Sequence, residues 1–270
     1  MALVVNSNIA SLNSQRQLSR STNDLQENYQ RLSSGKRINS AKDDAAGLQI
    51  SSRLTAQING LNQASRNAND GISLAQTAEG ALDEYTNNLQ RMRTLAVQSS
   101  NGSNNTSDRA ALNSEYTELY TELSRIAKDT EFGGVKLLDS SYTEDFQIGA
   151  NKGQTITIEI SAGLSAGAVS VSMGVSTFTR AQSVIAKIDT ALATVNGVRA
   201  DLGAKQNRFS SIIRSNDNTA ENVSASRSRI EDTDFAAETA KLARSSVLQQ
   251  ASSSMLAQAN QQPQIALSLL

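Results

Sequence analysis

The residues of this chain that could carry out chemistry are few, and the adjacent pair Asp43–Asp44 stands out among them. Two neighbouring carboxylates could act as an acid pair or supply half of a metal site. Neighbouring helical residues point in different directions and no third ligand is evident, so helix capping explains the pair better. Ser40 fits an N-cap with Asp43 three residues on, and Asp44 adds negative charge to the first turn. Arg91 and Arg93 could bind an anion, but a solvated helical face is the simpler interpretation.

The composition removes most catalytic chemistry. The 270 residues include no Cys and no His, which excludes disulfides, thiolate nucleophiles, the commonest metal ligand and the usual general base at neutral pH. A carboxylate or lysine mechanism stays open. The formal net charge of -1 implies no strong attraction to nucleic acid or to an anionic membrane. We therefore expect no enzyme, no cofactor and no metal site.

Seven-residue spacing of apolar side chains is the strongest pattern in the chain, and it predicts the elements that position everything else. Leu18, Leu25 and Leu32 form the first stripe. The later stripes are Leu54, Leu61, Ala68, Ala75, Leu82, Leu89 and Ala96, then Leu112 to Ile126, then Ile185 to Ile213, and last Phe235 through Leu242 to Leu256. Such stripes predict a mainly α fold, a long antiparallel helical bundle or coiled coil.

Turn residues and one alternating segment interrupt the helices. The cluster SSNGSNNTS, residues 99–107, predicts a turn between two helices, and Gly133–Gly134 is expected to break the third helix. Thr155–Ile160 alternates as a strand does, and Val169, Val171 and Met173 repeat the alternation. The sequence therefore predicts a small β-hairpin insert between the helical halves.

Both ends of the chain lack charge. Residues 1–15 and 245–270 contain no charged side chain and are rich in Ser, Gln, Ala and Leu. A solvated terminal helix usually carries charges, so the ends are either frayed tails or helices that bury against a partner. The mild amphipathicity of both ends favours helices that bury against each other and against neighbouring subunits.

No targeting segment is expected. The apolar run Leu3–Val5 is short and has no positive charge before it, so it does not fit a secretory signal. No apolar stretch reaches transmembrane length. Glycan acceptor patterns occur at Asn101, Asn104, Asn105 and Asn222. Without a secretory signal, chance matches in Asn/Ser-rich segments explain these patterns better.

Five longer motifs lie in order along the chain. They are RLSSGKRINSAKDDAAGLQIS at residues 31–51, SRNANDGISLAQTAEGAL at 65–82, LQRMRTLAVQSSNG at 89–102, SRIEDTDFAAETAKL at 228–242, and VLQQASSSMLAQANQQPQIALSLL at 247–270. These motifs resemble the N- and C-terminal signatures of bacterial flagellins. The resemblance covers most of the chain and is weakest at residues 140–180, where flagellins vary.

The resemblance implies a domain organisation in which the paired N- and C-terminal helices form an inner core. The expected segments are 1–45 and 231–270 for the two halves of the inner-core domain, 46–139 and 181–230 for the outer-core domain, and 140–180 for a short variable β region. Because that middle segment is short, the chain resembles a short flagellin without extra surface domains.

The resemblance also implies function. We expect an extracellular structural subunit that polymerises into the flagellar filament for swimming, exported unfolded through the flagellar secretion apparatus without a cleaved signal peptide. A hook–filament junction protein and a secreted adhesin or host-receptor ligand are the alternatives. The residues expected to form the assembly seam are Leu18, Leu25, Leu32, Leu242, Leu248 and Leu256.

Several partners follow from the same resemblance. They are other copies of the chain, an export chaperone on the C-terminal segment, and the filament cap and hook-associated proteins. Arg91 and Leu95, four residues apart on one helix, and Glu115 on the next match positions that contact the animal innate immune receptor for flagellin in relatives that activate it. No nucleic acid and no membrane is expected as a partner.

Overall fold

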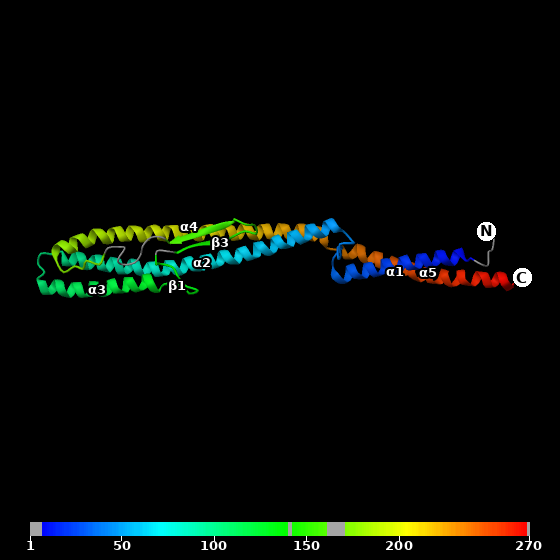
Figure 1. Ribbon diagram of the computed structural model, residues 1–270, viewed down its shortest axis with the longest axis horizontal. Coiled ribbons are helices and arrows are strands. Elements are labelled where there is room, and N and C mark those ends of the chain that lie inside the picture. The colour runs from blue at the N-terminus through cyan, green and yellow to red at the C-terminus, as the bar shows by residue number, and fades with distance from the viewer. Residues whose placement is uncertain (1–6, 140–141, 161–170, 269–270) are drawn as a thin grey trace. The chain divides into compact units, whose positions relative to one another are not determined.

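The computed structural model describes residues 7–139, 142–160 and 171–268, and most of them lie in helices (Figure 1). In chain order the elements are α1 (Ile9–Ser34), α2 (Ala45–Ser99), α3 (Thr106–Asp129), β1 (Glu131–Phe132), β2 (Val135–Lys136), β3 (Tyr142–Gln147), β4 (Thr155–Ile160), α4 (Phe178–Glu231) and α5 (Phe235–Ser268). The predicted mainly α fold with a small β-hairpin and paired terminal helices is confirmed. Within the described residues, no helix combines the length and the apolar character that a membrane span requires.

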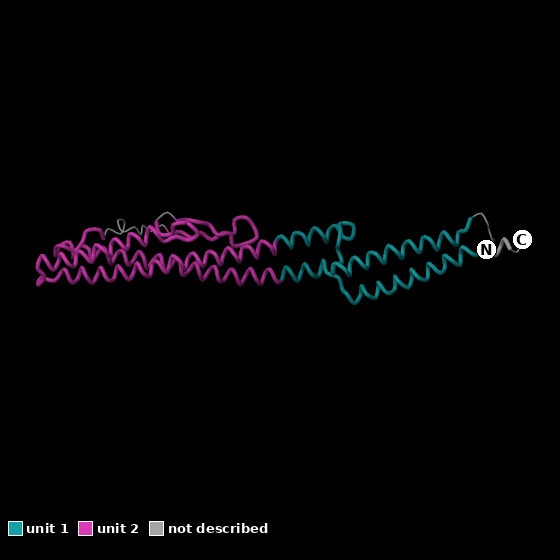
Figure 2. Tube along the Cα trace, turned by 90° about the horizontal axis from the view of Figure 1, so that it is seen from below, with its two compact units in different colours: residues 1–56, 222–270 teal, residues 57–221 magenta. Residues whose placement is uncertain are grey.

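The chain divides into two compact units (Figure 2). The terminal unit combines residues 1–56 with residues 222–270, and the central unit consists of residues 57–221. Helices α2 and α4 contribute to both units, since the division falls inside each of them. The boundaries expected after residues 45 and 230 lie inside the terminal unit.

The core of the central unit is built from the predicted stripe on α2 together with α3, α4 and the hairpin. Its largest fully buried side chains include Tyr85, Tyr116, Leu123 and Phe209. The ring of Phe209 packs edge-on against Phe146 of β3, with ring centroids 5.9 Å apart. The buried members of the α2 stripe are Leu61, Ala68, Ala75, Leu82, Leu89 and Ala96.

The hairpin consists of β3 and β4, paired antiparallel with Tyr142 opposite Ile160 and Gln147 opposite Thr155. The apolar side of β4 is buried, as its alternation predicts. The prediction of a second alternating strand at residues 169–173 is wrong for residues 171–173, which lie outside any strand. Residue 169 is not among the described residues. The Val171 carbonyl instead accepts a hydrogen bond from the Tyr116 hydroxyl at 2.6 Å.

Helix α2 begins differently from the expectation. Asp44 is its N-cap, because the carbonyl of Asp44 accepts the first helical hydrogen bond and its carboxylate accepts one from the Gly47 N–H at 2.8 Å. Ser40 therefore does not cap the helix. The carboxylate of Asp43 instead accepts hydrogen bonds from the backbone N–H groups of Asn39 and Ser40, and these bonds lower its pKa.

Gly133 and Gly134 do not break helix α3, which ends earlier, at Asp129. They form the two-residue turn between β1 and β2, with φ of +59° and +84°. Both values lie in the left-handed region that residues with a side chain rarely adopt, which is why this tight hairpin turn takes two glycines. The predicted turn at residues 99–107 is confirmed between α2 and α3, where Asn105 and Asp108 form a capping box.

The Phe209 ring should contribute more to stability than any exposed ring on the same helix. Replacing Phe209 by Ala leaves a cavity beside Phe146 and Gly71, and we expect it to lower the free energy of unfolding by about 3–5 kcal/mol. Urea unfolding of the monomer, followed by circular dichroism, measures this change. The matched control is Phe178→Ala on α4, where the ring is 51% exposed and the effect should be small. Equal effects of the two substitutions would contradict this account of the core.

Candidate assembly surface

Helices α1 and α5 lie side by side and antiparallel in the terminal unit (Figure 1). Hydrogen bonds along their length fix this direction. Asn8 near the start of α1 donates to the Ala259 carbonyl near the end of α5 at 2.7 Å, and Asn28 near the end of α1 donates to the Ser245 hydroxyl at 3.1 Å. The two ends of the chain, which include the uncharged segments 1–15 and 245–270, therefore pair with each other.

The buried line between α1 and α5 consists of small and polar side chains. Ser21 and Asn28 of α1 and Ser245, Ser252 and Ala259 of α5 are all less than a tenth exposed. On each helix these positions lie seven residues apart, so one stripe faces the partner helix. Because most of these side chains are small, the helices can approach closely. The hydrogen bond between Asn28 and Ser245 joins the two helices within this line. We call this line the polar seam.

The predicted leucines lie beside the polar seam. Leu18, Leu25, Leu32, Leu242 and Leu256 are half-buried, and Leu248 is exposed. Each therefore leaves apolar surface uncovered in the single chain. Sequence reasoning missed the polar seam because it followed apolar residues only. The seven-residue spacing of Glu238, Ser245, Ser252 and Ala259 was the available signal.

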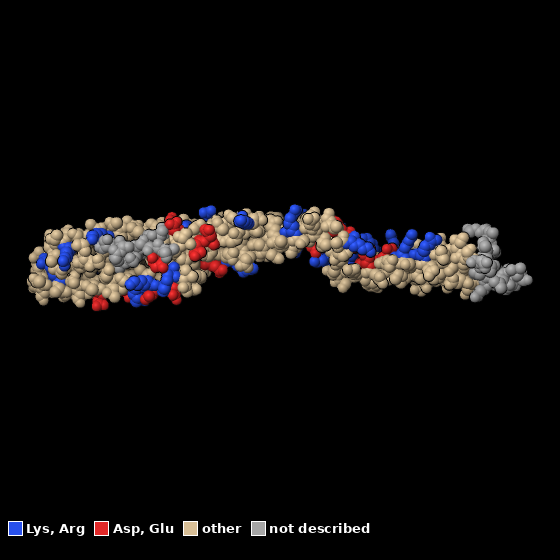
Figure 3. All heavy atoms as spheres, viewed as in Figure 1, with Lys and Arg blue, Asp and Glu red and all other residues tan. Residues whose placement is uncertain are grey.

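Large apolar side chains project from the same helices into solvent. They include Ile9 and Leu12 of α1 and Val247 and Met255 of α5, each more than half exposed. The described residues around them, 7–15 and 245–262, carry no charge, and on the face seen in Figure 3 this part of the terminal unit is free of charged groups. An uncharged surface with exposed Ile, Leu, Val and Met is typical of a protein–protein contact.

One carboxylate is buried where α1 and α5 pair. The Glu238 side chain is 3% exposed and forms an ion pair with Lys241 at 3.0 Å and a longer one with Arg31 at 3.9 Å. Arg31 is also paired with Glu27 on its own helix. A buried charge is tolerated only beside opposite charges, so Glu238 disfavours other registers of α1 and α5, in which Arg31 would lie farther away.

The turn after α1 is hydrogen-bonded to the α4–α5 junction by backbone groups. The Arg37 N–H donates to the Glu231 carbonyl at 2.7 Å, and the Thr233 N–H donates to the Gly35 carbonyl at 3.0 Å. Gly35 ends α1 with a φ of +71°, in the left-handed region that favours glycine. We call these two hydrogen bonds the chain clamp. They fix the end of α1 beside the start of α5.

Side chains reinforce the chain clamp around the Glu231 carboxylate. This group is largely buried and accepts hydrogen bonds from the Lys36 ammonium and the Ser51 hydroxyl. Both bonds favour the charged form, so the pKa of Glu231 is lowered, with Lys36 the larger cause. Lys36 is also paired in a β-bridge with Asp232. The chain clamp and the Glu231 carboxylate together therefore join the turn after α1 and the first part of α2 to the end of α4.

In the central unit, two of the three residues matched to the receptor contact lie together at the surface. Arg91 of α2 donates to the Glu115 carboxylate of α3 at 2.8 Å, and both side chains are about half exposed. Leu95 is only 1% exposed and lies in the core with Leu89 and Met92. The expectation that Leu95 shares the surface of Arg91 is therefore wrong for this unit, because α3 packs over that side of α2.

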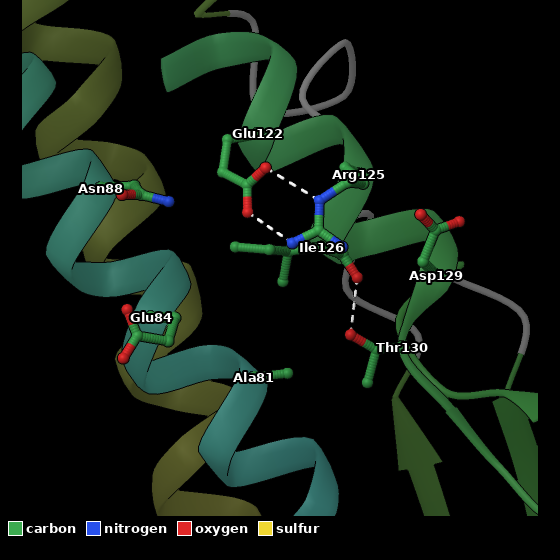
Figure 4. Close-up of a pocket in the computed structure, with 8 residues that line it drawn as sticks. All are labelled: Ala81, Glu84, Asn88, Glu122, Arg125, Ile126, Asp129 and Thr130. Carbon is green, nitrogen blue, oxygen red and sulfur yellow. Dashed lines mark hydrogen bonds and ion pairs between the residues drawn. The ribbon is translucent and has the colours of Figure 1, made fainter. Parts of the chain in front are cut away.

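A cleft of about 330 Å³ lies between α2 and α3 in the central unit (Figure 4). Glu122 and Arg125 face each other in it, with two hydrogen bonds of 2.6 and 2.8 Å, and the Thr130 hydroxyl donates to the Ile126 carbonyl. The bonds from Arg125 lower the pKa of Glu122. The charged pair is satisfied within the cleft, and the described residues contain no cluster of three or more acidic side chains placed to hold a metal ion.

Comparison with known families decides the identity of this arrangement. The family model for the bacterial flagellin N-terminal helical region matches residues 5–143. The family model for the bacterial flagellin C-terminal helical region matches residues 185–270. The chain belongs to the bacterial flagellin family. Flagellins are structural proteins, so the chain is a self-polymerising subunit of an extracellular flagellar filament and not an enzyme.

Relatives of known sequence agree with the family assignment. The chain is 48% identical over 272 residues to a flagellin of Halalkalibacterium halodurans, with 99% of this chain and 100% of the relative covered. It is 42% identical to flagellin D of Vibrio cholerae, with both chains covered completely. That alignment extends over 377 positions, so the Vibrio flagellin carries residues that this shorter flagellin lacks.

Solved structures agree as well. The crystal structure of Bacillus cereus flagellin is 31% identical, with a TM-score of 0.51 over 56% of this chain and 88% of that chain. A putative flagellar hook-associated protein from Vibrio parahaemolyticus has a TM-score of 0.59 over 70% of this chain and 100% of that chain. Its identity of 15% shows a shared fold only.

The polar seam makes a specific prediction for this flagellin. Ser245→Leu places a large side chain where α1 and α5 approach and removes the partner of Asn28, so we expect the helices to separate and filament growth from seeds to fall at least about tenfold, a change of roughly 1.4 kcal/mol. Light scattering of seeded growth measures the rate. The control is Ser246→Leu, at an exposed neighbouring position on α5. Normal filament growth with the Ser245→Leu protein would contradict this prediction, because it would show that a large side chain fits between α1 and α5.

Proposed function

We propose that this flagellin is the main filament subunit for swimming motility and that the α1–α5 pair of the terminal unit supplies the contacts between subunits. The observation that carries the proposal is the set of large apolar side chains that the single chain leaves exposed on α1 and α5, Ile9, Leu12, Val247 and Met255, all within chain segments that carry no charge. Contact with another protein surface removes such apolar area from water at a gain in free energy. Further copies of the chain carry the same uncharged surface and can cover it.

Repeated contacts of one kind between unlike surfaces produce an open helical array when the rotation from one copy to the next does not close a ring. In this proposal the terminal unit is the inner core of that array and the central unit is the outer core. Turned by a motor at its base, such an array produces thrust. The half-buried leucines beside the polar seam, Leu18, Leu25, Leu32, Leu242 and Leu256, complete their burial against neighbouring subunits.

We also propose export of the chain in an unfolded state through the flagellar secretion apparatus. Helices α1 and α5 each bury only one narrow, mostly polar line in the single chain, so little apolar burial opposes their separation. Low stability of the paired ends before assembly agrees with passage through an export channel.

Leu256→Asp tests the proposed subunit contact. It places a charge in an apolar contact without a partner, so we expect the monomer to keep its helical circular dichroism spectrum and to fail to elongate filament seeds. Removal of residues 246–270 should leave a soluble, still partly helical monomer that also fails to elongate seeds. Ser253→Asp, at an exposed position three residues earlier, is the control for added charge. Normal filaments from Leu256→Asp or from the truncated chain would refute the proposal. A hook–filament junction protein would leave seeds unextended even with the unaltered sequence.

A chaperone that covers the C-terminal segment before export is a further proposed partner. Val247, Leu248 and Met255 are exposed on α5 and would otherwise promote premature association. Titration calorimetry with the flagellar export chaperone of the same bacterium should detect binding to the full chain and none after removal of residues 231–270. Unchanged affinity of the truncated chain would place the chaperone site elsewhere. The filament cap and the hook-associated proteins are proposed partners at the filament ends.

The exposed pair Arg91–Glu115 supports a proposed contact with the animal innate immune receptor for flagellin. Arginine is a frequent anchor in interfaces because its planar group makes directed hydrogen bonds. We expect monomer to activate the receptor in a reporter assay, intact filament to be silent, and Arg91→Ala to raise the required dose at least about tenfold. The control is Arg125→Ala, which removes another exposed, paired arginine of the central unit. A silent wild-type monomer, or full activity of Arg91→Ala, would exclude the contact.

A further inference from the structure

Three Asn–Gly pairs occur in the sequence, at Asn59–Gly60, Asn101–Gly102 and Asn196–Gly197. An asparagine followed by glycine is the dipeptide in which the next backbone nitrogen most easily attacks the side-chain amide, because glycine has no side chain to hinder the approach. Asparagine is for this reason among the residues that limit the lifetime of a protein. All three asparagines of these pairs are exposed, so water reaches each of them.

The three Asn–Gly pairs differ in backbone conformation. Asn59–Gly60 lies inside α2 and Asn196–Gly197 inside α4. In an α-helix the glycine N–H donates to the carbonyl four residues earlier, and the helical dihedrals keep that nitrogen away from the preceding side chain. Ring closure at either helical pair therefore requires local unfolding of a long helix.

Asn101–Gly102 lies in the turn between α2 and α3, outside both helices. Among the described residues, the Gly102 N–H has no hydrogen-bond acceptor. The Asn101 side-chain carbonyl accepts a hydrogen bond from the Ser103 N–H at 3.3 Å. This bond draws electrons from the amide carbon and helps to stabilise the negative charge that develops on its oxygen during attack.

We infer that Asn101 is a site of spontaneous deamidation in the folded protein and that Asn59 and Asn196 are protected. In the first step the Gly102 nitrogen bonds to the Asn101 side-chain carbon, the bond from that carbon to its amide nitrogen breaks, and ammonia leaves with the proton from the Gly102 nitrogen. The product is a five-membered succinimide. Water then adds to one of its two carbonyl carbons and opens the ring to aspartate or isoaspartate.

The change places a new negative charge in a defined setting. The Arg109 guanidinium donates to the Asn101 carbonyl at 3.0 Å and to the Ser99 carbonyl at the end of α2 at 3.1 Å. The carboxylate therefore forms in the residue that this cation already contacts. Isoaspartate also adds a carbon to the backbone of the turn, where the Asn101 carbonyl accepts a bond from the Asn104 N–H at 3.3 Å.

The test follows all three sites in one protein. Purified full-length chain is aged at mildly alkaline pH, digested in heavy-oxygen water so that deamidation during preparation is marked, and mapped by mass spectrometry with enzymatic methylation of isoaspartate. We expect product at Asn101 to form at least about tenfold faster than at Asn59 or Asn196, a difference of about 1.4 kcal/mol in activation free energy. In urea the three rates should come within a few-fold of one another.

Two glycine variants provide matched controls. An added Cβ at Gly102 or at Gly197 would meet no heavy atom within 4 Å, and neither residue has a positive φ, so both alanine variants should fold normally. Gly102→Ala should slow product formation at residue 101 at least about tenfold, and Gly197→Ala should leave that rate unchanged. Equal rates at the three sites in the folded chain, no product at Asn101, or no effect of Gly102→Ala would each overturn the inference.

Discussion

The contact on which the rest of this flagellin depends is the antiparallel pairing of its two chain ends through small polar side chains. Large apolar residues at Ser21, Ser245 and Ser252 would not fit between helices that approach so closely, and they would hold α1 and α5 apart. Serine and asparagine bring the helices together and leave the neighbouring leucines half-buried. The single chain therefore leaves these leucines partly exposed to water, which is the basis of the proposed contacts between subunits.

The central unit, in contrast, buries its large apolar side chains within the single chain. Its α2 stripe, the aromatic rings of Tyr85, Tyr116 and Phe209, and the apolar side of β4 form one continuous core. Buried polar groups there find partners inside the unit, as the Tyr116 hydroxyl does at the Val171 carbonyl. A core of this kind is stable without further copies. One chain thus combines a unit with a continuous apolar core and a unit whose paired helices leave large apolar side chains exposed.

Much of this organisation was predictable from sequence, because helical stripes are local patterns. The stripe from Leu54 to Ala96 predicted α2, and the alternation of Thr155–Ile160 predicted β4. The partner of β4 was not predictable, since Tyr142–Gln147 does not alternate and its pairing depends on cross-strand contacts. The burial of Leu95 depends on where α3 packs, and the polar seam has no apolar signal. The sequence thus predicted elements well and their mutual contacts poorly.

The chain clamp has a consequence for how flagellins of different lengths can share one assembly unit. Backbone hydrogen bonds join Gly35 to Thr233 and Arg37 to Glu231, so the stretch between these residues is a closed loop of chain that starts and ends beside the α1–α5 pair. Lengthening such a closed excursion costs entropy only with the logarithm of its length. Added residues within it can therefore change what the subunit displays while α1 and α5 keep the same register. The α1–α5 pairing can therefore stay the same while the chain between the two helices varies in length and sequence.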